Sequence, residues 1–533
     1  MTAAARHPRR KLIFVPAGFA AALTLIPIVY VAIRSLGADS YAWERLFSER
    51  TLELLVNSLG LAGAVAVAAI AISLPYAWLV TSTDMPGRRF FEITGPLPLV
   101  VPSYVGAAIM IDAFGPRGLL QEFVESPLGI ERIPSIYGFF GAFATLTLFT
   151  YPYVLLLTVA AFKRVDPAME ETARGLGLSP VRAFVRTTLP QLRPALIAGG
   201  LLCALYAISD FGVVSLMRFD TFTRSIYNLY RSFYDPGGAA LLASVLIILT
   251  GMLLAIEYRL RVDPRKLAVR SVRANVQARA AIGRWRYAGL GFCLTIFSLS
   301  VVTPVLVLGY WIATGPQAEW FDASTISAIV GSVSASGYAA IAATALALPV
   351  AIVALRHSGR AARAIELITT SGFALPGVVV ALGLVFFATR FAGPLYQSLT
   401  LLVVAYVIRF IPQAIEGARA GLERADVNLE EAARGLGANR LRVFRRVTLP
   451  LATPGVAAGA MLVFLTAMKE LPATLILKPT GFETLATRIW EASNTASYSQ
   501  AAVPALILIA ISAVALAAGS AKRIDSGRPR PRD

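Results

Sequence analysis

Side chains that could perform covalent or metal chemistry are scarce in this 533-residue chain. Its two cysteines, Cys203 and Cys293, each lie inside an apolar run, where a thiol is a small core residue rather than half of a disulfide or metal pair. The two histidines, His7 and His357, stand beside arginines and have no partner for a metal site or a catalytic dyad. No lysine follows a glycine, so the phosphate-binding loop of nucleotide hydrolases is absent.

Carboxylates and glycines recur in one 25-residue block that occurs twice, at 166–190 and at 426–450. The copies read DPAMEETARGLGLSPVRAFVRTTLP and DVNLEEAARGLGANRLRVFRRVTLP, with fourteen identical positions. In the first copy Asp166 can cap a short helix, Glu170 and Glu171 suit its positive N-terminal end, and Gly175 and Gly177 end it. The second copy repeats these positions as Asp426, Glu430, Glu431, Gly435 and Gly437.

A basic amphipathic helix follows the glycines in each copy, with arginines such as Arg182 and Arg186 on one side and apolar residues on another. This pattern is typical of a helix that lies at lipid headgroups. A pair of ordinary interfacial hairpins is the alternative interpretation. A dinucleotide-binding fingerprint is disfavoured, because Pro180 and Arg440 stand where its third glycine belongs.

The composition determines what must hold these blocks. Hydrophobic residues make up 56% of the chain and charged residues 15%, whereas soluble domains contain about 25% charged residues. A soluble enzyme and a disordered chain are therefore excluded. The formal net charge is +18, but no long basic run or aromatic-interleaved patch indicates a nucleic-acid partner. We expect an all-α, polytopic membrane protein.

About 20 apolar residues are needed for each helix that crosses a bilayer. Twelve stretches meet this length, near 12–34, 54–80, 93–113, 136–160, 195–217, 238–257, 287–313, 326–355, 367–390, 396–412, 455–477 and 500–519. The first is too long for the apolar region of a cleaved signal peptide and lacks a clear cleavage site, so we expect it to be retained. The two termini and the even-numbered connections hold 36 of the 49 Lys and Arg residues, which predicts that both termini are cytoplasmic.

The chain reads as two parallel halves of six spans each. An offset of 274 aligns Pro75 with Pro349, Glu92 with Glu366 and Pro102 with Pro376, and an offset of 260 applies from about Tyr151 onward. The expected boundaries are 1–262 for the first half, 263–286 for a basic cytoplasmic linker and 287–533 for the second half. The extra length of the first half is an external segment at 114–134 that holds Glu122, Glu125 and Glu131, which we expect to be a solvated loop.

Two acidic residues, Asp210 and Glu470, are paired by the 260 offset and lie inside apolar stretches. Each is 16 residues after a proline, which is about 24 Å along a helix and in the outer third of a bilayer. An ionisable residue within a membrane is a candidate functional residue, so these acids and the neighbouring Lys469 are candidates for a substrate pathway. The structural alternative is that Glu470 pairs with Lys469 or another neighbour, while Asp210 caps a broken helix end.

The repeated block resembles the EAA loop of binding-protein-dependent ABC importer permeases, here near 163–194 and 413–454. The matching residues are Glu171, Ala173, Gly177, Leu189 and Pro190 in the first copy, and Glu431, Ala432, Ala433, Gly437, Leu449 and Pro450 in the second. Thr172 and Thr187 depart from the usual alanine and isoleucine. The resemblance implies a permease with the type I importer fold in a bacterial plasma (inner) membrane.

The same resemblance implies the partners and the coupling residues. Each short helix would dock into a cleft of a separate ATPase subunit, a homodimer, which would use ATP and magnesium. No cofactor would be bound by this chain. A periplasmic or lipid-anchored substrate-binding protein would deliver the substrate from outside, and the lipid bilayer is the surrounding partner. The coupling residues would be Glu170, Glu171, Ala173, Gly175 and Gly177 with Glu430, Glu431, Ala432, Ala433, Gly435 and Gly437.

The fused arrangement resembles the iron(III) permease subgroup over nearly the whole chain. Iron(III) is a hard cation that favours oxygen ligands, so two symmetry-related carboxylates would suit its path. Similar fused permeases for thiamine, phosphonates and polyamines remain alternatives. A more remote one is a major-facilitator secondary transporter, whose D-x-x-G-R-R loop is similar to the segment 84–89. However, Val80 replaces the leading glycine of that loop, and such a transporter has no reason to carry duplicated coupling helices.

Overall fold

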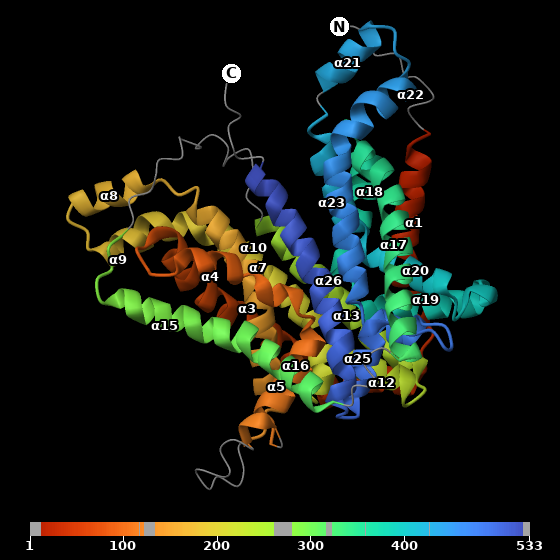
Figure 1. Ribbon diagram of the computed structural model, residues 1–533. Helices are drawn as coiled ribbons and strands as arrows, with labels where there is room; N and C mark the ends of the chain where they lie inside the picture. The colour runs from red at the N-terminus through yellow and green to blue at the C-terminus, as the bar shows by residue number, and fades with distance from the viewer. Residues whose placement is uncertain are drawn as a thin grey trace. The chain divides into compact units, whose positions relative to one another are not determined.

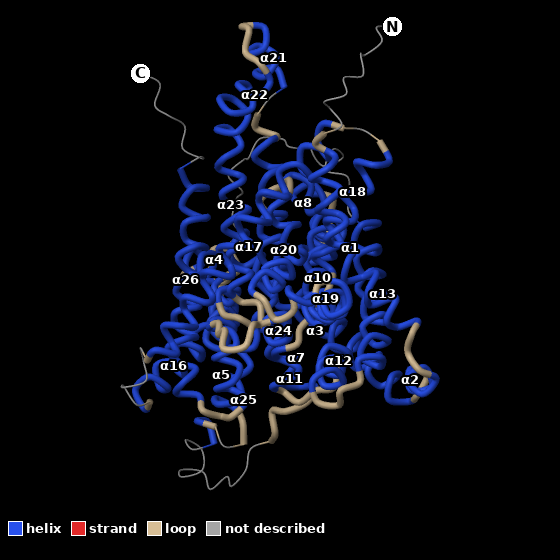
Figure 2. Tube along the Cα trace, turned by 90° about the vertical axis from the view of Figure 1, so that its right-hand side faces the viewer, coloured by secondary structure: helices blue, strands red, loops and turns tan. Residues whose placement is uncertain are grey.

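The computed structural model describes residues 12–116, 118–121, 134–260, 280–315, 322–357, 359–425 and 427–525. Within these ranges every regular element is helical, and the one β-type contact is an isolated bridge between Thr83 and Ala280 (Figure 2). Glu122, Glu125, Glu131 and Asp426 lie outside the described residues, as does most of the expected linker. Cys203 and Cys293 are free and buried, as expected.

Nine helical runs among the described residues are long and apolar enough to cross a membrane, and eleven if each of two bent pairs counts as one span. The nine are Phe14–Leu36, Glu49–Ser82, Phe139–Phe162, Pro180–Ser209, Pro236–Glu257, Trp285–Thr314, Ala323–Arg356, Leu399–Leu422 and Leu441–Met468. A further apolar helix is α26 (Tyr498–Asp525). Each of the twelve predicted stretches falls on one of these helices or pairs, which confirms the all-α polytopic class.

The third and ninth predicted spans, 93–113 and 367–390, are broken rather than continuous. Arg88–Val100 and Ser103–Gln121 meet at 99°, and Arg360–Ala374 and Gly377–Phe391 meet at 113°. Pro102 and Pro376 lie at the two breaks and precede α5 (Ser103–Phe114) and α19 (Gly377–Phe391). Proline cannot continue a helix and disfavours helical backbone in the residue before it, which explains both bends.

The fifth and eleventh spans begin earlier and break earlier than 195–217 and 455–477. The basic segment after the glycines is not a separate surface helix, because α9 (Pro180–Ala183) continues through a π-helical turn (Phe184–Thr188) into α10 (Leu189–Ser209). In the second half α22 (Arg440–Val443), a π-helical turn (Phe444–Thr448) and α23 (Leu449–Met468) do the same. The short helices α11 (Gly212–Leu216) and α24 (Pro472–Leu477) follow the breaks.

The described residues form two compact units that do not coincide with the two halves of the sequence. Unit 1 comprises Met1–Leu46, Ile226–Ile247 and Pro316–Asp533, and unit 2 comprises Phe47–Ser225 and Ile248–Gly315. The first helix of each half therefore packs with the bundle of the other half. In unit 1, α1 (Phe14–Leu36) lies along α17 (Ala323–Arg356), α18 (Arg360–Ser371) and α19 (Figure 1). In unit 2, α15 (Trp285–Phe297) and α16 (Thr303–Thr314) pack on α4 (Arg88–Thr94) and α5.

Side-chain contacts specify this exchange. In unit 1 the ring of Tyr30 on α1 meets Phe387 of α19 at 5.3 Å between centroids, and a Cβ on Gly383 would lie 2.5 Å from the Cα of Pro27. In unit 2 the indole N–H of Trp311 donates to Asp112 over 2.7 Å. Inside a bilayer the hydrophobic effect contributes little to helix association. Van der Waals packing, here between aromatic rings and between closely spaced backbones, and interhelical hydrogen bonds join the helices instead.

The core of unit 1 is the contact between α17, α20 (Leu399–Leu422) and α23. Two glycine pairs spaced by four residues, Gly417 with Gly421 and Gly455 with Gly459, bring the backbones of α20 and α23 together. A Cβ on Gly417 would lie 2.5 Å from the Cα of Gly459, and one on Gly455 would lie 2.6 Å from the Cα of Gly421. Small residues at this spacing permit the closest helix crossings in membranes.

The core of unit 2 is the corresponding contact between α3 (Glu49–Ser82), α7 (Phe139–Phe162) and α10. Only one glycine of the set recurs, because Leu157, Ala161 and Ala195 stand at three of the four positions 260 residues earlier. Gly199 is the fourth, and its Cβ would lie 2.7 Å from the Cα of Val154. The same three-helix core thus has less glycine at its crossing in the first half. Four further helices are α2 (Ser40–Leu46), α12 (Phe222–Arg231), α13 (Pro236–Leu260) and α25 (Leu485–Asn494).

Candidate functional site

The repeated block folds into the predicted short helix and glycine turn in both halves. α8 (Pro167–Gly175) begins at Asp166, whose carboxylate accepts from the N–H of Ala168 over 3.0 Å. It ends in a turn at Gly177, which has a φ of +88°. α21 (Val427–Gly435) ends in the same way at Gly437, with a φ of +85°. Glycine adopts this left-handed conformation without the steric cost that a side chain brings, so both turns depend on it.

The helix–turn unit presents the same exposed face in each half. Glu171 and Glu431 are exposed, as are Gly175, Gly177, Gly435 and Gly437. Between the glycines, Leu176 and Leu436 are 82% and 89% exposed. An apolar side chain held out at the tip of a rigid turn is a typical contact for a partner protein. We did not predict these two leucines from the sequence, although their position between two glycines was a visible signal.

The alanines of the block divide between the two sides of the helix. Ala173 is 7% exposed and so faces its own unit, and Ala433 is half-buried. Ala432 is exposed beside Glu431. The predicted coupling residues are therefore not one surface: some face outward, where a partner could reach them, and the others hold the helix to the chain that carries it.

Glu430 belongs to the inward-facing group. Its side chain is 3% exposed, and its two oxygens accept from both terminal nitrogens of Arg356, over 2.7 and 2.5 Å. The hydroxyl of Thr448 donates to the same carboxylate over 2.6 Å. Burial alone would raise the pKa of Glu430, but these donors outweigh it and hold the pKa below the ordinary glutamate value. The carboxylate is thus ionised and bonded to helices on both sides of it.

Glu170, the counterpart of Glu430, is held more weakly. It accepts from the hydroxyl of Thr188 over 2.8 Å and from Arg174 of its own helix over 2.7 Å. Its side chain is 25% exposed. The threonine contact is shared by the two halves and comes from the π-helical turn in each case. Of these two glutamates, only Glu430 has an arginine contact from another helix among the described residues, from Arg356 at the end of α17.

The sequence alone did not identify Arg356. It lies 74 residues from Glu430 and is the last residue of α17. α3 and α17 each have 34 residues and match along the 274 offset, which pairs Arg356 with Ser82. The only available signal was this mismatch between the copies, a serine against an arginine at the same helix end.

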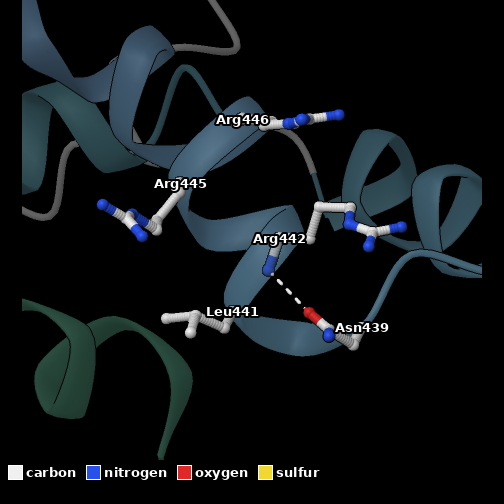
Figure 3. A pocket seen from close by; sticks show the side chains of 5 residues that line it. All are labelled: Asn439, Leu441, Arg442, Arg445 and Arg446. Atoms are coloured by element: carbon white, nitrogen blue, oxygen red, sulfur yellow. Dashed lines mark hydrogen bonds between the residues drawn. The ribbon is translucent and has the colours of Figure 1, made fainter.

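A cluster of arginines follows α21 in the chain. An open hollow at the start of the Leu441–Met468 run is lined by Asn439, Leu441, Arg442, Arg445 and Arg446 (Figure 3). The side chain of Asn439 caps the helix by accepting from the N–H of Arg442 over 2.9 Å. Leu441 is 65% exposed among the arginines. An apolar residue within a basic cluster at the end of a spanning helix suits the headgroup region of a membrane.

Asp210 lies at the break between α10 and α11. It is 9% exposed, accepts from the hydroxyl of Ser103 over 2.6 Å, and caps α11 by accepting from the N–H of Val213 over 2.8 Å. Ser103 is the first residue of α5, next to Pro102. The carboxylate therefore joins two helix breaks of the same half by accepting from a hydroxyl and from a backbone N–H.

Glu470 occupies the equivalent break between α23 and α24. It is 6% exposed, pairs with Arg409 of α20, and caps α24 by accepting from the N–H of Ala473 over 3.1 Å. A Cβ on Gly377, at the start of α19, would lie 2.8 Å from the Arg409 guanidinium. Arg409 is another partner that we did not predict. Lys469, the last residue before the break, is half-buried.

These contacts match the structural alternative that the sequence left open for Asp210 and Glu470. The described residues contain no group of three or more His, Cys, Asp or Glu side chains arranged to hold a metal ion. Assignment of Asp210, Glu470 and Lys469 to a substrate pathway stays a prediction. The assignment of the α8 and α21 residues to ATPase coupling stays a prediction as well.

Comparison with known proteins adds the family. The model described as "Binding-protein-dependent transport system inner membrane component" matches twice, over residues 85–267 and 343–525. The Fe(3+)-transport system permease protein FbpB 2 of Haemophilus influenzae is 32% identical over 92% of this chain and 94% of its own length. A putative ferric transport system permease protein, FbpB 1, of the same organism is 24% identical over 80% of this chain and 70% of its own length.

A third relative has the length of one half. The molybdenum transport system permease protein ModB of Escherichia coli is 28% identical over 34% of this chain and 80% of its own length. The double match of the family model and the size of this relative agree with two fused halves. The two matched segments contain the α8 and α21 blocks respectively.

Proposed function

Since the chain belongs to the family of binding-protein-dependent transport system inner membrane components, of which it is a fused, two-half, multi-pass member, we propose that it is the permease of an ATP-driven iron(III) importer. A separate ATPase, a homodimer, engages α8 and α21, uses ATP and magnesium, and drives the spanning helices between outward and inward access. A periplasmic or lipid-anchored binding protein delivers the iron(III). This chain binds no cofactor of its own.

The observation that carries the proposal is the matched pair of exposed faces on α8 and α21. Each presents a glutamate, a glycine-bounded leucine and a left-handed glycine turn, and each continues through a π-helical turn into a spanning helix. A force applied to either short helix is thereby delivered to a helix that crosses the membrane. Two such faces fit the two subunits of an ATPase dimer, which is why we favour a homodimeric partner.

Iron(III) is the proposed substrate because two relatives that align along most of this chain are ferric permeases by name. Carboxylate oxygens would suit a hard cation, but Asp210 and Glu470 are both committed to helix breaks. Iron held by a carrier, or passed along neutral oxygens, needs no free carboxylate. Thiamine, phosphonate and polyamine compounds are the competing substrates for a transport assay.

The proposal is tested by copurification from the native membrane. Tagged permease in mild detergent should recover an ATP-binding cassette subunit, and the double charge reversal Glu171→Lys with Glu431→Lys should lose it. Glu44→Lys, on the exposed surface of α2, is the matched control and should retain the ATPase. Proteoliposomes with the recovered ATPase and binding protein should then take up radiolabelled iron(III) in preference to the competing substrates.

Two outcomes would overturn this function. One is purification of the wild-type chain as a lone polypeptide that transports substrate on an ion gradient, which is the behaviour of a secondary transporter. The other is full ATP-driven uptake by the Gly177→Val with Gly437→Val variant, because valine is strained at a positive φ and would distort both turns.

A further inference from the structure

The contact between Arg356 and Glu430 joins the end of a spanning helix to α21. Arg356 is the last residue of α17, and its guanidinium bonds both oxygens of a carboxylate that is 3% exposed. Thr448 bonds the same carboxylate from the π-helical turn that leads into α23. We infer that Arg356 is a positioning residue that fastens α21 to α17 and α23, so that the two coupling helices transmit unequally, the second more rigidly than the first. This inference rests on the proposed function.

The helices beneath the contact form one packed body. Ala351, five residues before Arg356 on α17, is buried in one cluster with Ala418 and Leu422 of α20 and Ala452 of α23. The glycine contacts of α20 and α23 adjoin this cluster, since a Cβ on Gly421 would meet the backbone of Ala452. Close-packed interiors transmit displacement rather than absorb it. A movement of α21 therefore displaces α17, α20 and α23 together.

Among the described residues, the first half has no arginine from α3 on Glu170, and it has fewer glycines where its own three helices cross. α3 ends at Ser82, whose hydroxyl bonds to the neighbouring Thr81, while Glu170 is bonded outside α8 by Thr188. Arg174 belongs to α8 itself and so does not tie that helix to another. Leu157 and Ala161 stand where α20 has Gly417 and Gly421. A single hydroxyl bond is weaker than a buried bidentate arginine–carboxylate pair, so α8 is less firmly held to its bundle.

The fastening itself is measured by hydrogen exchange of the purified full-length chain, without any partner. We expect peptides from 427–435 to exchange more slowly than those from 167–175. In Arg356→Gln the first set should exchange roughly tenfold to a hundredfold faster, because a buried carboxylate loses its paired cation. Arg363→Gln, an exposed arginine on α18, is the matched control and should leave both sets unchanged.

A transplant supplies the reverse experiment. Ser82→Arg places the same side chain at the corresponding helix end of the first half, with Glu170 as its intended partner. We expect slower hydrogen exchange over 167–175 in this variant than in the wild-type chain. When Glu170→Gln is added, the exchange should return to the wild-type rate. Equal exchange of the two short helices in the wild-type chain, together with no effect of Arg356→Gln, would overturn the inference.

The consequence for transport is measured in proteoliposomes that contain the whole transporter. Arg356→Gln and Glu430→Gln should each lower substrate moved per ATP hydrolysed about tenfold, while ATPase binding through the exposed faces persists. Glu170→Gln should lower that ratio no more than about twofold, since it removes only an ion pair with Arg174 of the same helix, and the amide oxygen can still accept from Thr188. The charge swap Arg356→Glu with Glu430→Arg should recover the ratio, which a merely unfolded segment would not do.

The exchange and transport experiments together distinguish failure of the proposed function from failure of this inference. If the wild-type chain recruits no ATPase, the proposed function fails, and the exchange data still decide whether Arg356 fastens α21. If the ATPase binds and the ratio is unchanged in Arg356→Gln, the unequal transmission is wrong even though the function stands. Lack of recovery by the charge swap, with normal assembly, also contradicts the positioning role.

Discussion

The helix breaks at Asp210 and at Glu470 are built on the same backbone plan with different chemistry. In the first half a serine on α5 donates to the aspartate, and Phe149 fills the neighbouring space, where a Cβ on Gly106 would clash with the phenyl ring. In the second half the offsets pair Phe149 with Arg409, and Ser103 with Gly377. The longer glutamate and its arginine occupy the volume that the missing serine side chain leaves.

This difference shows that a repeat preserves the shape of a junction while its interactions change. In each half a glycine makes room for the large side chain at this position. Gly106 lies against Phe149 in the first half, and Gly377 lies against Arg409 in the second. At one junction a serine hydroxyl and a backbone N–H donate to the acid beside an aromatic ring, and at the other an arginine pairs with the acid. The halves should therefore respond unequally to equivalent substitutions, and that inequality can be measured.

The largest expected effect is at the buried ion pair. Arg409→Leu should lower the stability of unit 1 by about 3–5 kcal/mol, because it leaves the Glu470 carboxylate buried without its cation. Adding Glu470→Gln should recover most of the loss. Asp210→Asn is the matched change in the first half and should cost only about 1–3 kcal/mol. Thermal unfolding in detergent measures all three, and equal losses at the two breaks would contradict the comparison.

The next largest effect is at the crossing of α20 and α23. Gly417→Leu introduces the residue that the first half carries as Leu157, but here its Cβ would meet the Cα of Gly459 at 2.5 Å. We expect a loss of about 1–3 kcal/mol or more from overpacking, measured by the same unfolding assay. Gly337→Leu on α17 has open space around its Cβ and serves as the control. A tolerated leucine at 417 would show that the two crossings are equally close.

A moderate, local effect is expected from pH. The pKa of Glu430 is lowered in the folded chain, so its contribution is complete above the ordinary glutamate value of 4.5 and is lost as the pH falls through the folded value. The protection of 427–435 from hydrogen exchange, corrected for the intrinsic rate, should therefore decline as the pH falls below about 4.5. The decline should vanish in Glu430→Gln. Loss of protection near neutral pH instead would point to a different group.

The smallest effect is expected at the ion pairs of the broken spans, which keep partial access to solvent. Glu92 bonds Lys163, directly after α7, and Glu366 bonds Arg419 of α20, over 2.5 and 2.8 Å. The acids match along the 274 offset, but the bases come from different positions. Glu92→Gln and Glu366→Gln should each change stability by about 0–1 kcal/mol, as is usual for ion pairs that solvent can reach. A loss of several kcal/mol at either one would identify it as a structural anchor.

Much of the fold follows from local pattern. The apolar stretches predicted the positions of the helices, because about 20 apolar residues can span the bilayer as a helix whichever helices pack beside them. The repeated block predicted α8, α21 and both glycine turns, since caps and left-handed glycines are local signals. The bends at Pro102 and Pro376 were missed, although both prolines had been aligned, because proline within a spanning helix is often tolerated.

Local sequence patterns did not predict which residues the candidate residues contact. Arg409 is 61 residues from Glu470, and Arg356 is 74 residues from Glu430. Neither spacing follows from helix periodicity, because both are set by which helices pack together. The exchange of α1 and α15 between the bundles was equally invisible, since it depends on contacts such as Tyr30 with Phe387 that lie hundreds of residues apart.

The exchanged first helix has a consequence for how the chain is made. α1 is synthesised first, yet the helices that cover it, α17 to α19, begin at Ala323. At about 5–20 residues per second, nearly 300 residues of synthesis leave α1 waiting roughly 15–60 s for its neighbours. During that interval its proline and aromatic surface faces lipid or a membrane chaperone. One continuous polypeptide ensures that the neighbours arrive in equal number and in the same patch of membrane.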